Sequence, residues 1–320
     1  MLYINDSKIG LNISRIGLGT ARMGSRYDEA LSFDMLDSFF SSGGNFIDTA
    51  RNYYEWLPEG RGKSEKLIGK WMQRNSNRDK ICLLTKGGTH GEGSREIDLS
   101  ESSLIQDVNE SLDALKTDKI DIFALHRDDE EKDIAEIMYT MQKIIEIAKV
   151  KRICADCWST KRLKEANAYA IMHGLTPFTV VETWWSLAEY TKEMWNDPHT
   201  TNMSDEMMNY VVDNEMIVVG STSQCRGFFQ KAAEFGIEHV SSELLKRIAT
   251  KRNIMKLNFI KDYCEKNNIS VTMFVNSYIY SSPCKGIGLV SCSSVQQLND
   301  VLANTDYVLP ADIRKKVDLI

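Results

Sequence analysis

The chain has 320 residues, of which 42% are hydrophobic and 26% charged, as in an ordinary globular protein. Its net charge of −6 and its pI near 5.5 argue against nucleic acid as the main partner, because phosphate binding depends on clustered Lys and Arg. No apolar run approaches the ~20 residues of a membrane helix. The first ten residues lack the basic start and long apolar stretch of a signal peptide. We therefore expect no nucleic-acid or membrane partner and a cytoplasmic location.

Seven cysteines, an odd number, are scattered from Cys82 to Cys292, which suits a reducing compartment better than a disulfide framework. Cys154 and Cys157 form a C-x-x-C, the spacing of some redox and metal pairs. On a strand, however, residues three apart point to opposite faces. No second C-x-x-C and no clustered His accompanies the pair, so we expect no metal site.

Strand-like and helix-like runs alternate along the chain, with no Pro-rich or low-complexity linker between them. Residues 2–4 and 11–13 predict a leading β-hairpin. Eight short, mostly uniform apolar runs follow, the pattern of parallel strands that are covered on both faces. These runs are residues 16–19, 45–48, 81–86, 120–126, 152–157, 178–183, 216–221 and 286–291. The pattern predicts one α/β domain over residues 1–320, a (β/α)8 TIM barrel with an N-terminal β-hairpin.

The segments between the strands carry helix signals. Residues 134–148 have a broad apolar face, residues 241–268 are long enough for one or two helices, and residues 269–280 and 311–317 predict further helices. Helix ends are predicted from cap residues. These are Gly43 and Gly44 after the first helix, Asp98 with Glu101 as a capping box, and Ser159 and Ser204 as N-caps of the fifth and sixth helices.

Four polar residues stand at or just past the ends of predicted strands, where barrels of this kind carry their chemistry. They are Asp48, Tyr53, Lys86 and His126. A phenol has a pKa of ~10 and is a poor acid at neutral pH, but a neighbouring ammonium favours its ionised form. Tyr53 beside Lys86 meets that need, Asp48 can hold Lys86 charged, and His126 can donate a hydrogen bond to a substrate oxygen. Because no side chain supplies hydride, a nicotinamide is the natural donor.

Five segments together resemble the aldo-keto reductase family, with a match from Met1 to about Thr305. They are S-R-I-G-L-G-T at residues 14–20, F-I-D-T-A-x-x-Y at 46–53, S-E-x-x-I-G-x-W at 64–71, L-T-K at 84–86 and L-H-R-D-D at 125–129. The resemblance implies an eight-stranded barrel that reduces carbonyls with extended NADPH. It also implies that Tyr53 is the proton donor, that Lys86 and Asp48 tune it, and that His126 orients the carbonyl.

The positions that face the nicotinamide depart from the family pattern. Where the family has G-x-S-N-[FW]-S after the fifth strand, this chain reads C-A-D-C-W-S at residues 154–159. A family Gln corresponds to Glu182, and a frequent stacking aromatic corresponds to Ser221. The cofactor contacts that the resemblance implies are Gly19, Thr20, Asp48, Asp156, Cys157, Glu182, Ser221, Thr222, Gln224, Ser291, Ser293 and Gln297.

Around the eighth strand, residues 291–301 resemble the family segment that binds the adenosine phosphate, and serines before a helix N-terminus suit phosphate. Ser293 stands where the family can place an Arg that grips the 2′-phosphate. The resemblance implies NADP(H) as the cofactor, and the Ser in place of that Arg leaves NAD(H) as the alternative.

Aromatic and basic residues on the predicted rim loops are candidates for contact with a small carbonyl substrate, because rings there can stack on a sugar face or an apolar carbonyl compound. They are Trp56, Arg127, Trp158, Trp184 and Trp185, with ordinary barrel packing as the alternative for at least two of the rings; Tyr54 is expected to be a loop or pocket residue. Two alternatives to a reductase remain open, which are non-redox acid/base chemistry on a sugar and a ligand-sensing or regulatory binding role. No pattern predicts an oligomeric state.

Overall fold

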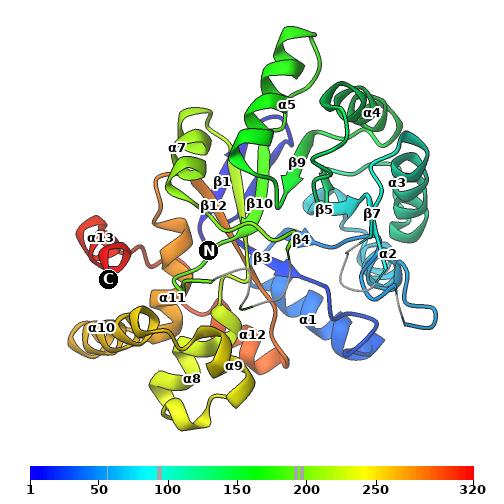
Figure 1. The fold of residues 1–320 in the computed structure, drawn as a ribbon. Coiled ribbons are helices and arrows are strands. Elements are labelled where there is room, and N and C mark those ends of the chain that lie inside the picture. Colours follow the sequence, from blue (N-terminus) through cyan, green and yellow to red (C-terminus); the bar gives the residue numbers. More distant parts are fainter. Residues whose placement is uncertain (56, 92–95, 191–193, 195–197) are drawn as a thin grey trace.

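The computed structural model describes the chain except residues 56, 92–95, 191–193 and 195–197. At its centre is a closed barrel of eight parallel strands that follow one another in chain order (Figure 1). The strands are β3 (Ile16–Gly19), β4 (Phe46–Asp48), β5 (Cys82–Gly87), β8 (Ile122–Leu125), β9 (Arg152–Asp156), β10 (Val180–Trp184), β11 (Ile217–Ser221) and β12 (Lys285–Val290). The predicted barrel is confirmed, and the ends of the predicted strands differ from the observed ends by at most two residues.

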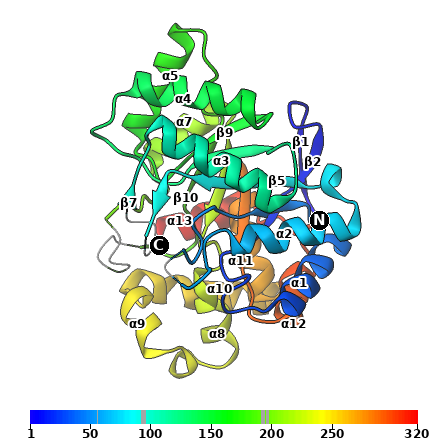
Figure 2. The ribbon, with the colours of Figure 1, turned by 90° about the vertical axis from the view of Figure 1, so that its right-hand side faces the viewer.

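An antiparallel hairpin closes one end of the barrel. It consists of β1 (Tyr3–Asp6) and β2 (Leu11–Ser14), as predicted. Ile4 and Ile13 pack against inward-facing residues at the beginnings of the strands, such as Phe46 and Cys82. In Figure 2 the hairpin lies on the opposite side of the molecule from the short strand β7 (Glu96–Ile97) and the helix α9 (Ser242–Ile248). The amino-terminal end of the barrel is thus sealed with apolar side chains, and the carboxyl end remains for polar ones.

Helices cover the outside of the barrel (Figures 1 and 2). They are α1 (Glu29–Ser41), α2 (Lys63–Asn75), α3 (Glu101–Leu115), α4 (Ile134–Ile147), α5 (Thr160–Met172), α7 (Asp205–Asp213), α8 (Phe228–Glu234), α9, α10 (Lys251–Asn267), α11 (Val271–Tyr280), α12 (Val295–Leu302) and α13 (Ala311–Leu319). Short 3-10 turns are η1 (Arg78–Lys80), η3 (Cys225–Gly227) and η4 (Ile237–His239), and β6 (Thr89–His90) pairs with β7. Within the described residues, no helix is both long and apolar enough to cross a bilayer.

Most of the predicted helix caps are confirmed. The Ser159 and Ser204 hydroxyls each accept a hydrogen bond from a backbone N–H in the first turn of their helix. Gly43 has φ +88° directly after the first helix, in the left-handed region that glycine tolerates. The capping box from Asp98 is wrong. Ser100 is the N-cap of α3, and Asp98, two residues before it, accepts a hydrogen bond from the Ser100 N–H instead of capping the helix.

Strand alternation decides which side chains reach the interior of the barrel. The layer of inward-facing side chains nearest the hairpin is apolar and contains Cys82, Leu84 and Ile122, among others. The next inward positions toward the carboxyl end are polar. They are Asp48 on β4, Lys86 on β5, His126 directly after β8, Asp156 on β9 and Glu182 on β10. All five are buried, so the fold gathers an acid/base cluster above the apolar layer.

Candidate active site

Lys86 is the centre of the cluster. Its side chain is only 1% exposed, and its ammonium forms a short ion pair with the Asp48 carboxylate. Lys86 Nζ lies 3.2 Å from the Tyr53 hydroxyl, which lies 3.3 Å from Asp48 Oδ2. Lys86 Nζ also donates to the Thr49 carbonyl at 3.2 Å. The structure therefore brings an ammonium, a carboxylate and a phenol into mutual contact.

Electrostatics keep the ammonium charged. Burial lowers the pKa of Lys86, but Asp48, Glu182, Tyr53 and Asp156 outweigh burial and raise the pKa well above its usual value. Burial raises the pKa of the Tyr53 phenol, Asp48 raises it further, and Lys86 opposes both. Tyr53 is therefore a neutral phenol that holds its proton beside a permanent cation. The expected lowering of the Tyr53 pKa by Lys86 is present as one contribution, but burial and Asp48 exceed it.

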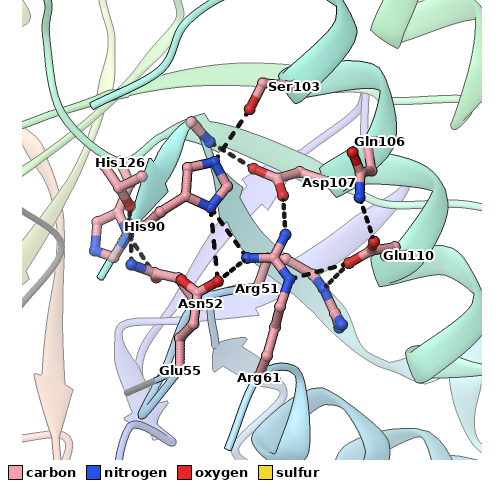
Figure 3. A network of polar contacts seen from close by, with 12 residues as sticks. Arg51, Asn52, Glu55, Arg61, His90, Ser103, Gln106, Asp107, Glu110 and His126 are labelled. Carbon is pink, nitrogen blue, oxygen red and sulfur yellow. Dashed lines mark hydrogen bonds and ion pairs between the residues drawn. The ribbon is translucent and has the colours of Figure 1, made fainter. Parts of the chain in front are cut away.

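His126 lies beside the phenol, with its ring in an edge-to-face arrangement 6.0 Å from the Tyr53 ring centroid. Its Nδ1 lies 3.1 Å from Asn52 Oδ1 (Figure 3). Thr89 Oγ1 lies 3.0 Å from the same nitrogen. Burial, Arg127 and Lys86 lower the pKa of His126 well below its usual value. The imidazole is consequently neutral. Sequence reasoning missed Asn52 and Thr89, although Asn52 directly precedes Tyr53 in the D-T-A-x-x-Y segment.

Two further carboxyl groups complete the cluster. Glu182 Oε2 lies 3.3 Å from Lys86 Nζ and forms no hydrogen bond within the described part of the chain. Asp156 Oδ2 lies 3.8 Å from both His126 Nε2 and Arg127 Nη1. Burial raises the pKa of Asp156 to about 6, against the opposing effect of Arg127 and Lys86. Burial, together with Asp48, also raises the pKa of Glu182 well above its usual value.

A network of ion pairs holds the segment that carries Asn52 and Tyr53 (Figure 3). Arg61 contacts Asp107 at 2.6 Å, Glu55 at 2.5 Å and Glu110 at 3.2 Å. Arg51 contacts Glu110 at 3.0 Å and the fully buried Glu65 at 2.7 Å. Because Glu65 lies on α2 and Asp107 and Glu110 lie on α3, the network ties the segment between β4 and α2 to the outer helices.

Several predicted cofactor contacts are engaged within the protein. Thr20 Oγ1 donates to the Asp48 carbonyl at 2.8 Å, and the Thr20 side chain is fully buried. Gln224 is paired with Asn276 at 2.7 Å. Gln297 accepts from both the N–H and the hydroxyl of Ser293, at 3.0 and 2.7 Å. The remaining predicted contacts lie at the carboxyl ends of their strands or directly after them, and they are Gly19, Ser221, Thr222, Ser291 and Cys157.

A group of arginines at the same end of the barrel was missed by sequence reasoning. Arg226 lies in η3 directly after β11, and burial and the positive charges of Arg247 and Arg22 lower its pKa. Arg22 follows β3 and donates to the Tyr27 hydroxyl at 3.3 Å, which donates to the Cys292 carbonyl at 2.6 Å. The arginines come from segments far apart in the sequence, and like charges held together favour an anionic ligand.

The structure separates the residues that were predicted to contact the substrate. Trp184 is the next inward position after Glu182 on β10, and its ring lies edge-to-face with Tyr190 at 5.9 Å. Trp158 is fully buried outside the barrel against Phe178, at 5.2 Å between ring centroids. Trp185 packs outside the barrel wall against Gly220 and Gly286.

Trp158 and Trp185 both pack in the hydrophobic cluster outside the barrel wall, which is the ordinary barrel packing that was the alternative to a substrate role for at least two of the rings. Arg127 lies in the cluster, where Nη1 donates to the His126 carbonyl at 2.7 Å. Trp56 lies outside the described residues. Tyr54, with φ +58°, is in the loop where it was expected.

A closed parallel barrel that presents a buried ammonium, a phenol, carboxyl groups and an imidazole at the carboxyl ends of its strands has the architecture of a TIM-barrel enzyme. The sequence pattern of the Aldo/keto reductase family matches residues 15–320. The chain therefore belongs to the aldo-keto reductase family, and the resemblance noted from the motifs is confirmed.

Three named relatives illustrate this membership. Over 199 residues the chain is 35% identical to norsolorinic acid reductase of Aspergillus flavus, which covers 58% of this chain and 50% of the relative. Over 196 residues it is 33% identical to aryl-alcohol dehydrogenase [NADP(+)] of Phanerodontia chrysosporium, with 56% and 49% covered. Over 195 residues it is 31% identical to a Saccharomyces cerevisiae protein named "Putative aryl-alcohol dehydrogenase AAD14", with 56% and 50% covered. The chain spans about half the length of these relatives.

Proposed function

We propose that this protein is an NAD(P)H-dependent oxidoreductase that reduces an aldehyde or ketone, with Tyr53 as the proton donor to the carbonyl oxygen. The observation that carries the proposal is the position of the Tyr53 hydroxyl, 3.2 Å from the buried Lys86 ammonium at the carboxyl end of the barrel. Membership of the aldo-keto reductase family supports it.

The residues at this end of the barrel fit a nicotinamide dinucleotide. Glu182 Oε2 is buried with the Lys86 ammonium at 3.3 Å and has no hydrogen bond of good geometry within the described residues, so it could accept one from a carboxamide NH2 group. Arg226 and its cationic neighbours suit the phosphates of the dinucleotide. NADP(H) is the expected cofactor because it carries an additional phosphate, and one relative is named as an NADP(+) enzyme. When bound, the reduced nicotinamide supplies hydride to the carbonyl carbon.

The side chains of the cluster transfer the proton and stabilise the charge that it leaves behind. Tyr53 gives its phenolic proton to the substrate oxygen as that oxygen gains negative charge. The phenolate that remains lies 3.2 Å from the Lys86 ammonium, which stabilises it. Asp48 keeps Lys86 charged and oriented. Because burial keeps water from the cluster, these interactions are stronger than they are in solvent.

The relatives suggest the class of substrate. Their names refer to norsolorinic acid and to aryl alcohols, and Trp184 offers a ring on the inward side of β10. We therefore propose an aromatic aldehyde or ketone as the substrate, with a sugar-derived carbonyl compound as the comparison that the assay includes.

The first test is a titration of the full chain with NADPH and NADH, followed by cofactor fluorescence. Saturable binding of either cofactor, with turnover of an aryl aldehyde, supports the proposal. In the Tyr53→Phe variant we expect turnover to fall by about 10²–10⁴-fold, with an unchanged Kd for the cofactor. Tyr139→Phe, at an exposed position on α4, is the control. Near-normal turnover in Tyr53→Phe would remove Tyr53 as the acid, and binding of neither cofactor would favour non-redox chemistry.

A further inference from the structure

The buried cluster at the carboxyl end of the barrel contains more acids than bases. Among the residues that the structure describes, its carboxyl groups are Asp48, Asp156 and Glu182, and its cations are Lys86 and Arg127. His126 adds no charge, because burial, Arg127 and Lys86 lower its pKa well below the usual value. With all three carboxyl groups ionised, the cluster therefore has an excess of negative charge.

The carboxyl group with the weakest compensation is Glu182. The Lys86 ammonium forms its short ion pair with Asp48, and Glu182 Oε2 shares the same ammonium at 3.3 Å. Glu182 Oε2 has no hydrogen bond of good geometry within the described part of the chain, although the side chain is buried. Two carboxyl groups thus depend on one cation. A buried negative charge that is only partly compensated favours the arrival of a further positive charge.

Glu182 also lies close to the place where hydride must be transferred. The Tyr53 hydroxyl and Glu182 Oε2 lie 3.2 and 3.3 Å from the same nitrogen, Lys86 Nζ. A carbonyl oxygen that receives the Tyr53 proton lies against that hydroxyl, and a hydride donor must contact the carbon of the same carbonyl. The nicotinamide ring therefore belongs beside the cluster. This ring is neutral in the reduced cofactor and positively charged in the oxidised cofactor.

We propose that Glu182, together with Asp156, makes this site bind the oxidised nicotinamide dinucleotide more tightly than the reduced one, so that the oxidised form inhibits carbonyl reduction by competing with the reduced form. The inference rests on the proposed function and adds a control of its rate by the ratio of the two cofactor forms. It requires no additional chemical step, because the proposed hydride transfer itself converts the neutral ring into the cation that the carboxyl groups favour.

Glu182 has this effect whether or not it is ionised before the cofactor binds. Burial and Asp48 raise the pKa of Glu182 well above its usual value, and Lys86 opposes them. The charged and titratable groups that act on Glu182 are Asp48 on β4, Tyr53 in the following segment, Lys86 on β5, and Cys154 and Asp156 on β9. If the carboxyl group holds its proton in the free protein, a positive ring lowers its pKa again and releases that proton. Binding of the oxidised form should then strengthen as the pH rises, relative to binding of the reduced form.

The first experiment measures binding without turnover. Isothermal titration calorimetry of the full chain with NADP+ and NADPH, in two buffers of different ionisation enthalpy, gives both Kd values and the number of protons released. At pH 7 we expect the Kd for NADP+ to be about tenfold or more below that for NADPH, as expected for a charge a few ångströms from a carboxylate. We also expect the ratio of the two Kd values to move further in favour of NADP+ at pH 8.

Matched variants assign the preference to the cluster. Glu182→Gln has nearly the same shape without the charge, so the ratio of Kd values should fall toward one, mainly through weaker binding of NADP+. Asp156→Asn should act in the same direction. Glu206→Gln is the control, because Glu206 is exposed on α7 and pairs with Lys164. Equal Kd values in the wild type, or an unchanged ratio in folded Glu182→Gln, would overturn the inference. Binding of neither the NADP nor the NAD forms would instead refute the proposed cofactor.

The second experiment measures inhibition during reduction of an aryl aldehyde. NADP+ added to the assay should compete with NADPH, with an inhibition constant of about a tenth of the KM for NADPH. The inhibition should weaken in Glu182→Gln and remain unchanged in Glu206→Gln. Turnover that equal concentrations of NADP+ and NADPH leave almost unaffected would overturn the inference and leave the reductase proposal intact, whereas absence of turnover with either cofactor would refute the reductase proposal.

Discussion

Replacing Lys86 with Met tests whether one ammonium holds the cluster of carboxyl groups together. Met has a similar volume but no charge, so the variant leaves Asp48 and Glu182 buried without their cation. At the 3.3 Å between Lys86 Nζ and Glu182 Oε2, a charge pair interacts by about 5 kcal/mol at an effective dielectric constant of ~20. Loss of one partner from a buried pair typically costs about 3–5 kcal/mol. We therefore expect the free energy of unfolding to fall by about 3–5 kcal/mol near pH 8.

The loss of stability in Lys86→Met should depend on pH in a defined direction. Burial already raises the pKa values of Asp48 and Glu182 in the folded protein, and Lys86 opposes this effect. Loss of the ammonium should therefore raise both pKa values further above those in the unfolded chain. The unfolded chain then releases these protons more readily as the pH rises, which destabilises the folded variant. The destabilisation should be smallest near pH 5 and largest near pH 8.

Urea unfolding followed by tryptophan fluorescence measures this effect, with two comparison variants. Lys86→Met combined with Asp48→Asn removes one of the buried carboxylates that has lost its cation, and it should recover part of the lost stability. Lys70→Met removes an ion pair with Glu29 in which both side chains are about half exposed, and it should cost at most ~1 kcal/mol. A Lys86→Met protein as stable as the wild type at pH 8 would refute the reasoning, because it would show that the carboxyl groups do not depend on Lys86.

Three more predictions concern packing and the cofactor. A Cβ at Gly69 would lie 2.4 Å from the Ala114 carbonyl oxygen. Gly69→Ala should therefore force α2 away from α3 and lower the free energy of unfolding in urea by about 1–3 kcal/mol. An unchanged urea midpoint would contradict this close approach. Arg226→Gln should raise the Kd for NADPH about tenfold or more, as expected for a charged hydrogen bond. The Kd is measured by cofactor fluorescence, with the surface variant Arg74→Gln as the control. A Kd equal to that of the control would remove Arg226 from the phosphate site. Trp158→Ala should cost about 3–5 kcal/mol of stability without changing KM. A raised KM at a temperature where the variant is folded would favour a substrate role for Trp158 over packing alone.

The sequence alone predicts the barrel because the information is local. Uniform apolar runs of strand length alternate with amphipathic helical segments, and only a parallel sheet covered on both faces accommodates many such runs. The polar residues at the ends of these runs, Asp48, Lys86 and His126, follow from the same pattern, since alternation along a strand fixes which side chains point inward. The capping box at Asp98 failed because two residues, Asp98 and Ser100, compete for the same turn, and spacing alone does not decide which caps the helix.

The tertiary structure decides which of these residues meet. Trp158 and Asp156 are two residues apart, yet Cys157 adopts φ +60°, so the chain turns and Trp158 points outside while Asp156 faces His126. Arg22 and Arg226 are far apart in the sequence and come together because β12 brings β11 and β3 near each other when the barrel closes. Contacts across a barrel depend on strand register and closure, which no local spacing encodes. The sequence thus determined the barrel and the order of the polar residues at the ends of its strands, whereas the fold determined which of these residues lie in contact.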